Sequence, residues 1–477
     1  MVFSNLTFVC LFLPGWLAVY FLAPQHARNL VLVAASLVFY VWGGRIAILL
    51  IVISIAANFA IGNALAVADM ARRHRLILWS VASNLLILII FKYTNFIIDN
   101  VNSVLDAFWD WKLPNPHIPL PLGISFFTFH IISYLVDVYR GTAQAQRSPS
   151  AFALYIINFP QLIAGPIIRY RPFAPQLDQR SVSFSDFDIG VARFAAGLAK
   201  KLLIANPIGA VCDHLFAVAP TDLPIWAVWL GVVCFGLQIY FDFSGYSDMA
   251  IGMARMFGFR FPENFNYPYT ATSIQDFWRR WHITLSAWFR DYVYVPLGGS
   301  RGTRWNTVRN LWIVFVLCGA WHGASWNFII WGMWHGFFLS LERAPLFARV
   351  LASAPAIARN TYVLLVVLVG WVFFRSPSLE LALDMLARMF GLQAGAATML
   401  PVSSHIAPPT MALIAVAACF SLPLWPRIKE LAGKLVITPA EQVAYDLTRA
   451  AYIGLITVLC LATMTIDQNN PFIYFQF

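Results

Sequence analysis

Long apolar runs separated by short polar stretches fill the chain from end to end. A helix needs roughly 20 apolar residues to cross the ~30 Å hydrocarbon layer of a membrane. Several runs are short or contain Gly and Pro, and these are expected to be half-buried or re-entrant. The pattern therefore predicts an all-α, polytopic transmembrane protein with about eleven spans. The candidate runs are 5–23, 29–43, 45–67, 77–98, 119–139, 187–212, 224–256, 310–326, 327–342, 361–375, 409–425 and 449–466.

Segment 151–168 is also apolar, but Pro160, Gly165 and Pro166 interrupt it. Broken backbone at membrane depth is tolerated only inside the protein or beside a cavity, because its polar groups lack helical partners. We therefore expect a re-entrant piece that is surrounded by other parts of the chain.

Composition excludes an ordinary soluble domain. Only 11% of the residues are charged and 60% are hydrophobic, whereas soluble domains carry about 25% charged residues. The net charge of +10 does not call for a nucleic-acid partner, since cytoplasmic loops of membrane proteins collect Lys and Arg. Membrane lipids are the expected surroundings.

Cysteine and histidine spacing predicts neither disulfides nor a metal site. The nine histidines are dispersed, and the six cysteines lie in apolar stretches, where we expect them to be buried small hydrophobic residues. The chain has no linker or low-complexity tract, so residues 1–477 are expected to form a single membrane domain with a motif-rich catalytic centre at about 119–340. The cysteines are Cys10, Cys212, Cys234, Cys318, Cys419 and Cys460.

Basic residues predict the topology. They gather in 72–75, 169–180, 255–309 and 427–434, whereas loop 99–118 has Lys112 alone against three aspartates. By the positive-inside rule the four basic regions face the cytoplasm and loop 99–118 faces the other side. Counting back along the runs gives an extracytoplasmic N-terminus.

Residues 273–292 are predicted to form one helix, which begins with the Ser-x-x-Asp signal of Ser273 and Asp276. Helical spacing places aromatic residues on one side and a cationic polar stripe with a histidine on the other. The aromatic side carries Phe277, Trp281, Trp288 and Tyr292, and the polar stripe carries Arg279, His282, Ser286 and Arg290.

Two interpretations of this helix remain open. It is typical of an interfacial helix, with a tryptophan belt and arginines that reach the lipid headgroups. Alternatively, the stripe lines a cavity for an anionic or phosphate-bearing ligand, because arginine favours phosphate. The Gly-rich stretch 296–302 that follows is either a phosphate-binding loop or only a turn.

His322 is the strongest single candidate for chemistry. It lies in Trp321-His322-Gly323 at the end of an apolar run, and an ionisable residue within the membrane is a functional candidate by default. The alternatives are a hydrogen-bonded core histidine and His335, which lies in a second Trp-His-Gly. Gly319 and Gly323, four residues apart, favour the close approach of another helix.

Two aspartates lie in the apolar run 224–256. Asp242 and Asp248 are six residues apart, so they do not share a helical face and are not expected to form an acid–base pair. Buried acids usually pair with arginines. The expected partners are Arg255, Arg279 and Arg290.

Six stretches together resemble the membrane-bound O-acyltransferase family, and within it the branch of inner-membrane subunits that acetylate alginate and other bacterial exopolysaccharides. Each stretch alone is unspecific, but together they span nearly the whole chain. They are PLGISF (121–126), FPQLIAGP (159–166), YFDFSGYSDM (240–249), FWRRWHITLS (277–286), WHG (321–323) and NPFIYFQF (470–477).

The resemblance implies a ring of about eleven tilted helices around a central funnel, with re-entrant and interfacial helices. It implies that His322 matches the family's catalytic histidine and that His282 matches a second histidine of the bacterial branch. His322 would act as general base, and His282 would orient the donor or polarise its carbonyl. The expected substrate-binding residues are Arg279, Arg290, Trp281, Asp242 and Ser286, with both arginines attracting donor phosphates.

The resemblance also implies the substrates and the setting. The donor would be acetyl-CoA from the cytosol, used as a substrate with no bound cofactor, and the site would lie in the bacterial inner membrane. The acetyl group would reach extracytoplasmic, alginate-like exopolysaccharide through a periplasmic acetyltransferase-like partner. The same motifs serve D-alanyl transfer to teichoic acid, which stays an alternative. A transporter or flippase for lipid-linked sugars is the alternative outside enzymes.

Overall fold

The computed structural model describes residues 3–43, 47–109, 111–394, 407–434 and 438–466. Every regular element in these ranges is a helix, which confirms the predicted all-α class. The stretch 470–477 that contributed to the family resemblance lies outside the described residues.

Seven helices in the described ranges are long and apolar enough to cross a membrane, and each coincides with a predicted run. The multi-pass architecture is thus confirmed. The seven are Gln25–Gly43, which joins η2 (Gln25–Ala27) to α2 (Arg28–Gly43); α3 (Ala47–Val67); α4 (Met70–Phe108); Phe184–Ala217, which joins α8 (Phe184–Ala199), the π-helix η3 (Lys200–Ala205) and α9 (Asn206–Ala217); α10 (Ile225–Met256); α16 (Ala356–Arg375); and α20 (Pro439–Ile466).

The expected count of about eleven spans is not confirmed by the described residues. Helix α5 (Ile124–Tyr139) has 16 residues, which rise only about 24 Å, and α14 (Trp326–Leu341) is equally short. Helices α18 (Pro408–Phe420) and α19 (Leu424–Lys434) meet at 69°, and would count as an eighth span if taken together. The ring and the funnel stay predictions.

The remaining helices connect or cover these spans. They are η1 (Phe8–Phe12), α1 (Leu13–Leu22), α6 (Pro149–Ile157), α7 (Tyr170–Asp178), η4 (Pro220–Asp222), η5 (Pro268–Thr270), α11 (Ile274–Arg280), α12 (Ile283–Phe289), η6 (Arg290–Tyr294), α13 (Arg304–His322), α15 (Pro345–Ser353) and α17 (Leu379–Met389).

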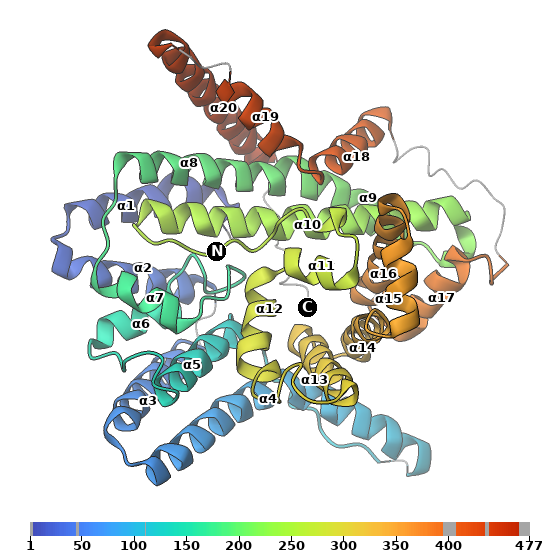
Figure 1. Cartoon of the computed structure of the whole chain (residues 1–477), viewed down its shortest axis with the longest axis horizontal. Coiled ribbons are helices and arrows are strands. Elements are labelled where there is room, and N and C mark those ends of the chain that lie inside the picture. Colours follow the sequence, from blue (N-terminus) through green and yellow to red (C-terminus); the bar gives the residue numbers. More distant parts are fainter. Residues whose placement is uncertain (1–2, 44–46, 110, 395–406, 435–437, 467–477) are drawn as a thin grey trace.

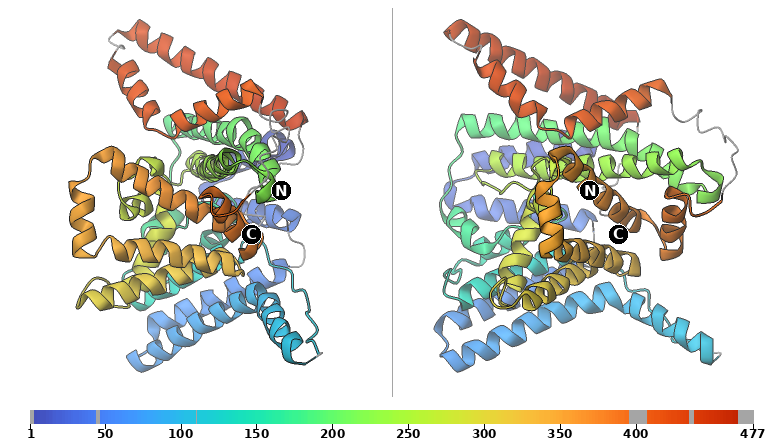
Figure 2. Two further views of the ribbon diagram at one scale, coloured as in Figure 1. Left: turned by 90° about the vertical axis from the view of Figure 1, so that its right-hand side faces the viewer. Right: turned by 45° about the vertical axis from the view of Figure 1, so that its right-hand side comes forward.

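Figures 1 and 2 show α4 and α20 at opposite edges of the molecule, with α11 to α14 between them. Helix α4 has 39 residues and is therefore about 58 Å long, well beyond the thickness of the hydrocarbon layer. It extends past the predicted run 77–98 in both directions. Part of the loop that we expected at 99–118 is therefore the end of this helix.

The predicted break in 151–168 is confirmed. Helix α6 ends at Ile157, and the chain that follows is buried up to Ile168. Side chains of other elements bind its amides: Ser36 Oγ accepts from the Phe159 N–H at 3.1 Å, and Thr284 Oγ1 accepts from the Ile167 N–H at 3.0 Å. These bonds satisfy the broken backbone, as burial requires.

Helices α8 and α10 lie side by side (Figure 1) and touch through two glycine pairs. A Cβ on Gly245 would lie 2.7 Å from the Gly197 carbonyl oxygen, and one on Gly252 would lie 2.6 Å from that of Gly190. Small residues at such contacts let helix backbones approach closely, and the gain in packing drives association where lipid removes the hydrophobic effect.

This close approach brings cations from α8 and η3 to the acids of α10. Lys201 Nζ lies 2.8 Å from Asp242 Oδ1, and both side chains are almost completely buried. Asp248 pairs with Lys200 at 2.6 Å and with Arg193 at 2.8 Å. Each buried carboxylate is therefore compensated inside the protein, as a low-dielectric surrounding demands.

The predicted partners of these acids were wrong. Arg255 instead lies 3.7 Å from Asp186, Arg290 lies 2.7 Å from Asp291, and Arg279 is exposed. Spacing along the chain reveals which residues are buried, but not which helix packs beside them. The glycine contacts determine that α8 and η3 are the elements that pack beside α10.

Polar contacts link three of the basic regions assigned to the cytoplasm. The Arg260 N–H donates to Gln176 Oε1 at 2.7 Å, and Arg169 pairs with Asp291. Arg73 Nη2 donates to the Tyr139 carbonyl at 2.9 Å, and the adjacent Arg140 Nη1 donates to the Asp291 carbonyl at 3.1 Å. This gathering agrees with the topology that the charge pattern predicts.

Four of the cysteines are buried, as expected, but Cys10 and Cys419 are exposed. On an apolar helix, the exposed side chains are those that would face lipid. Apolar neighbours in the sequence therefore do not show whether a cysteine contacts lipid or the protein interior.

We expect Gly245→Val to destabilise the protein. The new Cβ would force α8 and α10 apart and weaken the ion pairs beside the contact. Overpacking costs about 1–3 kcal/mol, so thermal unfolding in detergent should move to lower temperature. Gly454→Val in α20 is the control, because a Cβ there meets nothing within 4 Å. An equal loss in both variants would contradict the packing argument.

Candidate active site

The single helix predicted over 273–292 is broken at His282. Helix α11 ends at Arg280, α12 begins at Ile283, and Figure 1 shows the two running in different directions. His282 has φ 42° and ψ 54°, a left-handed conformation that costs a side-chain-bearing residue about 1–3 kcal/mol. The start of the helix is confirmed, since Ser273 Oγ accepts from the Asp276 N–H at 2.9 Å.

Asn264 holds the chain in this conformation. Its Oδ1 accepts hydrogen bonds from the Thr284 N–H at 3.3 Å, the Thr284 hydroxyl at 2.9 Å and His282 Nδ1 at 3.1 Å. Its backbone carbonyl accepts from the Ile283 N–H at 3.0 Å. Its Nδ2 donates to Ser247 Oγ in α10 at 3.0 Å. Asn264 thus caps α12 from outside the helix and ties it to α10.

These bonds fix the tautomer of His282. The Thr284 backbone N–H can only donate, so the Asn264 oxygen that it contacts, Oδ1, is an acceptor. His282 Nδ1 contacts the same oxygen and must therefore be the donor, so it carries the hydrogen. The other ring nitrogen, Nε2, then has a lone pair. It is buried and has no hydrogen-bond partner within the described ranges of the chain. It is therefore available to accept a hydrogen bond from a substrate.

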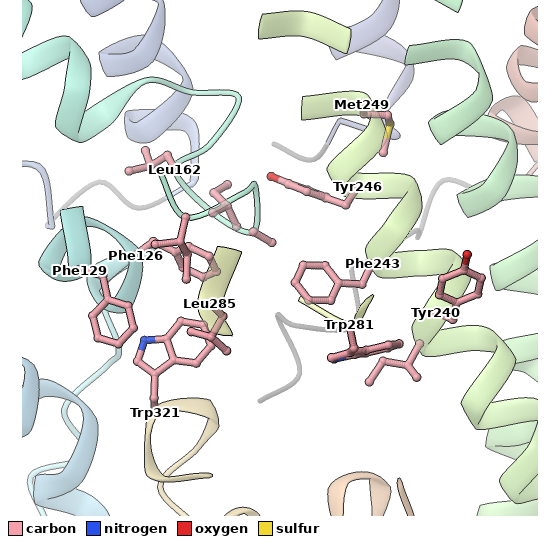
Figure 3. Packing of buried hydrophobic residues seen from close by; sticks show 14 of the residues in the cluster. Phe126, Phe129, Leu162, Tyr240, Phe243, Tyr246, Met249, Trp281, Leu285 and Trp321 are labelled. Atoms are coloured by element: carbon pink, nitrogen blue, oxygen red, sulfur yellow. The ribbon is translucent and has the colours of Figure 1, made fainter. Parts of the chain in front are cut away.

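His322 and His282 lie against the same tryptophan. His322 ends α13 with an exposed fraction of 7%, and its ring centroid is 4.9 Å from that of Trp321. The His282 ring centroid is 6.2 Å from the same Trp321 ring. Figure 3 shows Trp321 beside Phe129 and Leu285. The structure therefore brings the two predicted catalytic histidines to one aromatic cluster.

Glycines place the end of α13 against α14. A Cβ on Gly319 would lie 2.2 Å from the Phe328 carbonyl oxygen, and one on Gly332 would lie 2.2 Å from that of Phe315. The close approach predicted from Gly319 and Gly323 is confirmed. It also packs the His322 ring against Trp331 of α14, with 4.9 Å between centroids.

His335, the rival candidate, has a structural contact. Its Nδ1 accepts a hydrogen bond from Trp278 Nε1 at 3.3 Å, and its ring lies 5.1 Å from the rings of both Trp278 and Trp331. It is fully buried in this cluster. The arrangement is that of a hydrogen-bonded core histidine.

The predicted polar stripe does not form. Arg279 and Arg290 lie on either side of the break and are exposed, Ser286 is half-buried, and His282 is fully buried. The break turns the residues after it away from the face of α11. The periodicity that predicted one stripe assumed an unbroken helix.

Trp281 and Asp242 point into the core. The Trp281 ring lies 5.7 Å from Phe277 and 4.9 Å from Trp371. Figure 3 shows it on the side of α10, with Phe243. The Asp242 carboxylate is in an ion pair with Lys201. Neither side chain lies at an exposed surface, and their predicted contact with substrate stays a prediction.

Arg290 belongs to a charged cluster with Asp291 and Arg169. Arg290 Nε lies 2.7 Å from Asp291 Oδ1, and Arg169 contacts the second carboxylate oxygen. Partial burial raises the pKa of the Asp291 carboxyl, but the two guanidinium groups more than offset it and lower the pKa overall. This cluster stays charged at neutral pH.

The Gly-rich stretch 296–302 forms a turn. The N–H groups of Gly298 and Gly299 donate to the Val295 and Tyr294 carbonyls, at 3.0 and 2.8 Å. Since these amides are used within the turn, they are not directed at a phosphate, and the simpler of the two interpretations is favoured.

Residues 36–381 match the model of the membrane-bound O-acyltransferase family, MBOAT. The chain belongs to this family. It is 40% identical over 505 residues to the probable alginate O-acetylase AlgI of Azotobacter vinelandii, covering 100% of both chains. It is 37% identical over 427 residues to the peptidoglycan O-acetyltransferase of Helicobacter pylori, covering 82% of this chain and 80% of that protein. The teichoic acid D-alanyltransferase of Bacillus subtilis is 31% identical over 249 residues, 48% of this chain and 61% of that protein.

These matches make the protein a multi-pass membrane O-acyltransferase and confirm the family resemblance of its motifs. The family gives the class of reaction. The placement of the histidines, Asn264 and their neighbours comes from the structure of this acyltransferase itself.

Lys92 is a site residue that the sequence analysis missed. It lies in the membrane-spanning helix α4, and its Nζ contacts the Trp321 carbonyl oxygen one residue before His322. The adjacent Tyr93 hydroxyl contacts the Ala320 carbonyl oxygen. A cation is favourable at a helix C-terminus, where the last carbonyls lack helical partners. Lys92 is the one charged residue in the run 77–98, and this signal could have identified it.

We expect Asn264→Ala to lower acyl transfer and stability together. It leaves the Thr284 amide and His282 Nδ1 without their acceptor, at a cost of about 1–3 kcal/mol for buried donors. Thermal unfolding and the initial rate per folded molecule would be measured. Asn63→Ala is the control, since that amide binds the Phe59 and Gln146 carbonyls in another part of the fold. Equal activity loss in both would argue against a specific role of Asn264.

We expect Lys92→Met to reduce the rate of acyl transfer at saturating substrate by about tenfold. A cation at a helix C-terminus contributes up to ~2 kcal/mol, and a loss of this size is enough for a tenfold change in rate. Methionine keeps the apolar stem and removes the ammonium group that meets the end of α13. Steady-state kinetics in detergent is the measurement. Lys112→Met, at an exposed ion pair with Asp106, should leave the rate unchanged. A wild-type rate in Lys92→Met would remove this residue from the site.

Proposed function

We propose that this O-acyltransferase moves an acetyl group from acetyl-CoA to extracytoplasmic polysaccharide hydroxyls at the bacterial inner membrane. The observation that supports it most is the placement of His322 and His282 against Trp321. Two imidazoles in one buried aromatic cluster can serve proton transfer and substrate positioning in a dry site. His335 shares Trp331 with His322 in a similar way, but its Nδ1 already accepts a hydrogen bond from Trp278.

His322 is the proposed general base. The acceptor hydroxyl oxygen attacks the thioester carbonyl carbon while the imidazole takes the hydroxyl proton. The carbon–sulfur bond then breaks, and the imidazolium returns the proton to the leaving thiolate. A new oxygen–carbon bond replaces the thioester, and the histidine ends as it began. Holding both reactants at one point supplies the proximity that the step needs.

His282 is proposed to position a substrate. Its Nε2 lone pair accepts a hydrogen bond, whereas polarising a carbonyl would need a donor. The tautomer imposed by Asn264 therefore favours orientation of a substrate N–H or O–H over activation of the thioester carbonyl. Of the two roles that the family resemblance implied for His282, the structure supports the first.

The identity of the acyl group rests on the relatives. The A. vinelandii alginate O-acetylase and the H. pylori peptidoglycan O-acetyltransferase match most of this chain, whereas the D-alanyltransferase matches under half of it. This supports acetate over D-alanine. Exposed Arg279 and Arg290 are proposed to attract donor phosphates at the cytoplasmic mouth. A periplasmic acetyltransferase-like partner is proposed to pass the group to an alginate-like polymer.

We expect His322→Ala to lower acetyl transfer by at least about 100-fold, the usual contribution of a general base. Transfer would be followed in liposomes with radiolabelled acetyl-CoA and a polysaccharide acceptor. His335→Gln is the control. It keeps an acceptor for Trp278 and should retain activity. Wild-type transfer by His322→Ala would exclude this mechanism.

The same liposomes separate the proposal from its alternatives. Label that reaches the acceptor supports acetyl transfer. Movement of lipid-linked sugar without acyl chemistry would indicate a flippase. Transfer from a D-alanyl carrier, with none from acetyl-CoA, would indicate teichoic acid D-alanylation.

A further inference from the structure

A polar cleft opens at the basic region 169–180. Its volume is about 680 Å³. It lies between the start of α2, the end of α7 with the chain just after it, and the start of α6. None of its lining residues belongs to α11, α12, α13 or α14, which carry the histidine cluster. Figure 1 shows α2, α6 and α7 on the opposite side of the molecule from α14.

Two arginines line this cleft and share one aromatic ring. The guanidinium carbons of Arg28 and Arg180 lie 5.0 and 5.7 Å from the centroid of the Tyr20 ring. Arg180 Nε also donates to the Tyr20 hydroxyl at 3.0 Å, and its Nη1 donates to Asn29 Oδ1 at 2.7 Å. These contacts hold both cations in place without neutralising them.

The charge of these arginines is not balanced by a carboxylate. Neither Arg28 nor Arg180 is in an ion pair with any described residue. Arg28 Nε and Arg180 Nη2 are buried, and no acceptor for them lies in the described part of the chain. Asp178 is the single acid among the lining residues, and it is exposed. Buried donors on two cations indicate a missing anionic acceptor.

Apolar side chains next to the lining stretch 25–29 in sequence are exposed. Leu22 at the end of α1 is 87% exposed, Leu30 in α2 is 58% exposed, and Phe21 is 42% exposed. These residues flank the lining stretch 25–29 in sequence. A ligand with an anionic head and an apolar tail would satisfy both surfaces at once.

We propose that this cleft binds the phosphate of an anionic phospholipid headgroup, with Arg28 and Arg180 as its donors. Arginine binds phosphate oxygens in charge-assisted hydrogen bonds. Basic pockets between helices on the cytoplasmic side are typical sites for such headgroups. The acyl chains would lie along Leu22 and Leu30. The proposal does not depend on the acyl chemistry of the histidine cluster.

Native mass spectrometry of the detergent-purified full-length protein tests it. Wild-type protein should retain phosphatidylglycerol and not phosphatidylcholine. The double variant Arg28→Gln/Arg180→Gln should bind phosphatidylglycerol at least about tenfold more weakly, because charge-assisted hydrogen bonds are lost. Arg28→Gln alone should give the same direction of change. This single variant is the control for misfolding, because the contact described for Arg28 is its stacking on Tyr20, and its loss should disturb the fold less than the double change.

The matched control is Arg72→Gln/Arg75→Gln, which removes the same charge from exposed residues in a basic region on the same side. Equal weakening in this control would mean diffuse surface charge and would overturn the proposal. Equal retention of both lipids by the wild type would also overturn it. A further arm titrates inorganic phosphate alone. Arginine-dependent saturation by phosphate without lipid preference would assign the cleft to a soluble anion instead.

Discussion

Asn264 keeps the chain at His282 in a backbone conformation that an uninterrupted helix does not contain. Its side-chain and backbone oxygens accept four hydrogen bonds from His282, Ile283 and Thr284, where one helix ends and the next begins. The cost of the left-handed residue is offset because the amides at the start of α12 find acceptors in a buried place. The same bonds decide which nitrogen of His282 carries the hydrogen. Backbone strain and chemistry are thus set by one side chain.

Glycine contacts carry this local arrangement into the membrane. Within lipid, helices gain little from burying apolar surface, so close packing and internal polar pairs decide their association. Gly319 and Gly332 let α13 meet α14 at His322, and Gly197 and Gly245 let α8 meet α10. The second contact also brings Lys201 to Asp242. The same helix contact therefore provides both the close packing and the compensation of the buried charge.

The molecule separates two kinds of polar group. The histidine cluster is enclosed by aromatic rings, where a neutral imidazole can exchange protons without competition from water. The arginines of the cleft lie outside this cluster, at the start of α2 and just after the end of α7. A headgroup bound there would tie the ends of α1 and α2 to the membrane surface. The reaction site would remain out of reach of that lipid.

The sequence by itself determined the class of the protein. Apolar runs predicted all seven helices of the described residues that are long enough to span, because the cost of unpaired backbone in lipid forces each run into a helix. Pro160 and Gly165 predicted the buried break, and the motifs around His322 and His282 predicted the family.

Only the tertiary structure decided how these pieces meet. Nothing in the pattern of 273–292 predicted that the helix stops at His282, because the periodicity is helical and Asn264 lies nearly twenty residues earlier. Asp242 was expected beside an arginine and lies beside Lys201, and Lys92 reaches the end of α13 from a helix over two hundred residues away. Periodicity reports which residues avoid lipid. Partner choice depends on which helix surfaces fit together, and that is a property of the folded chain.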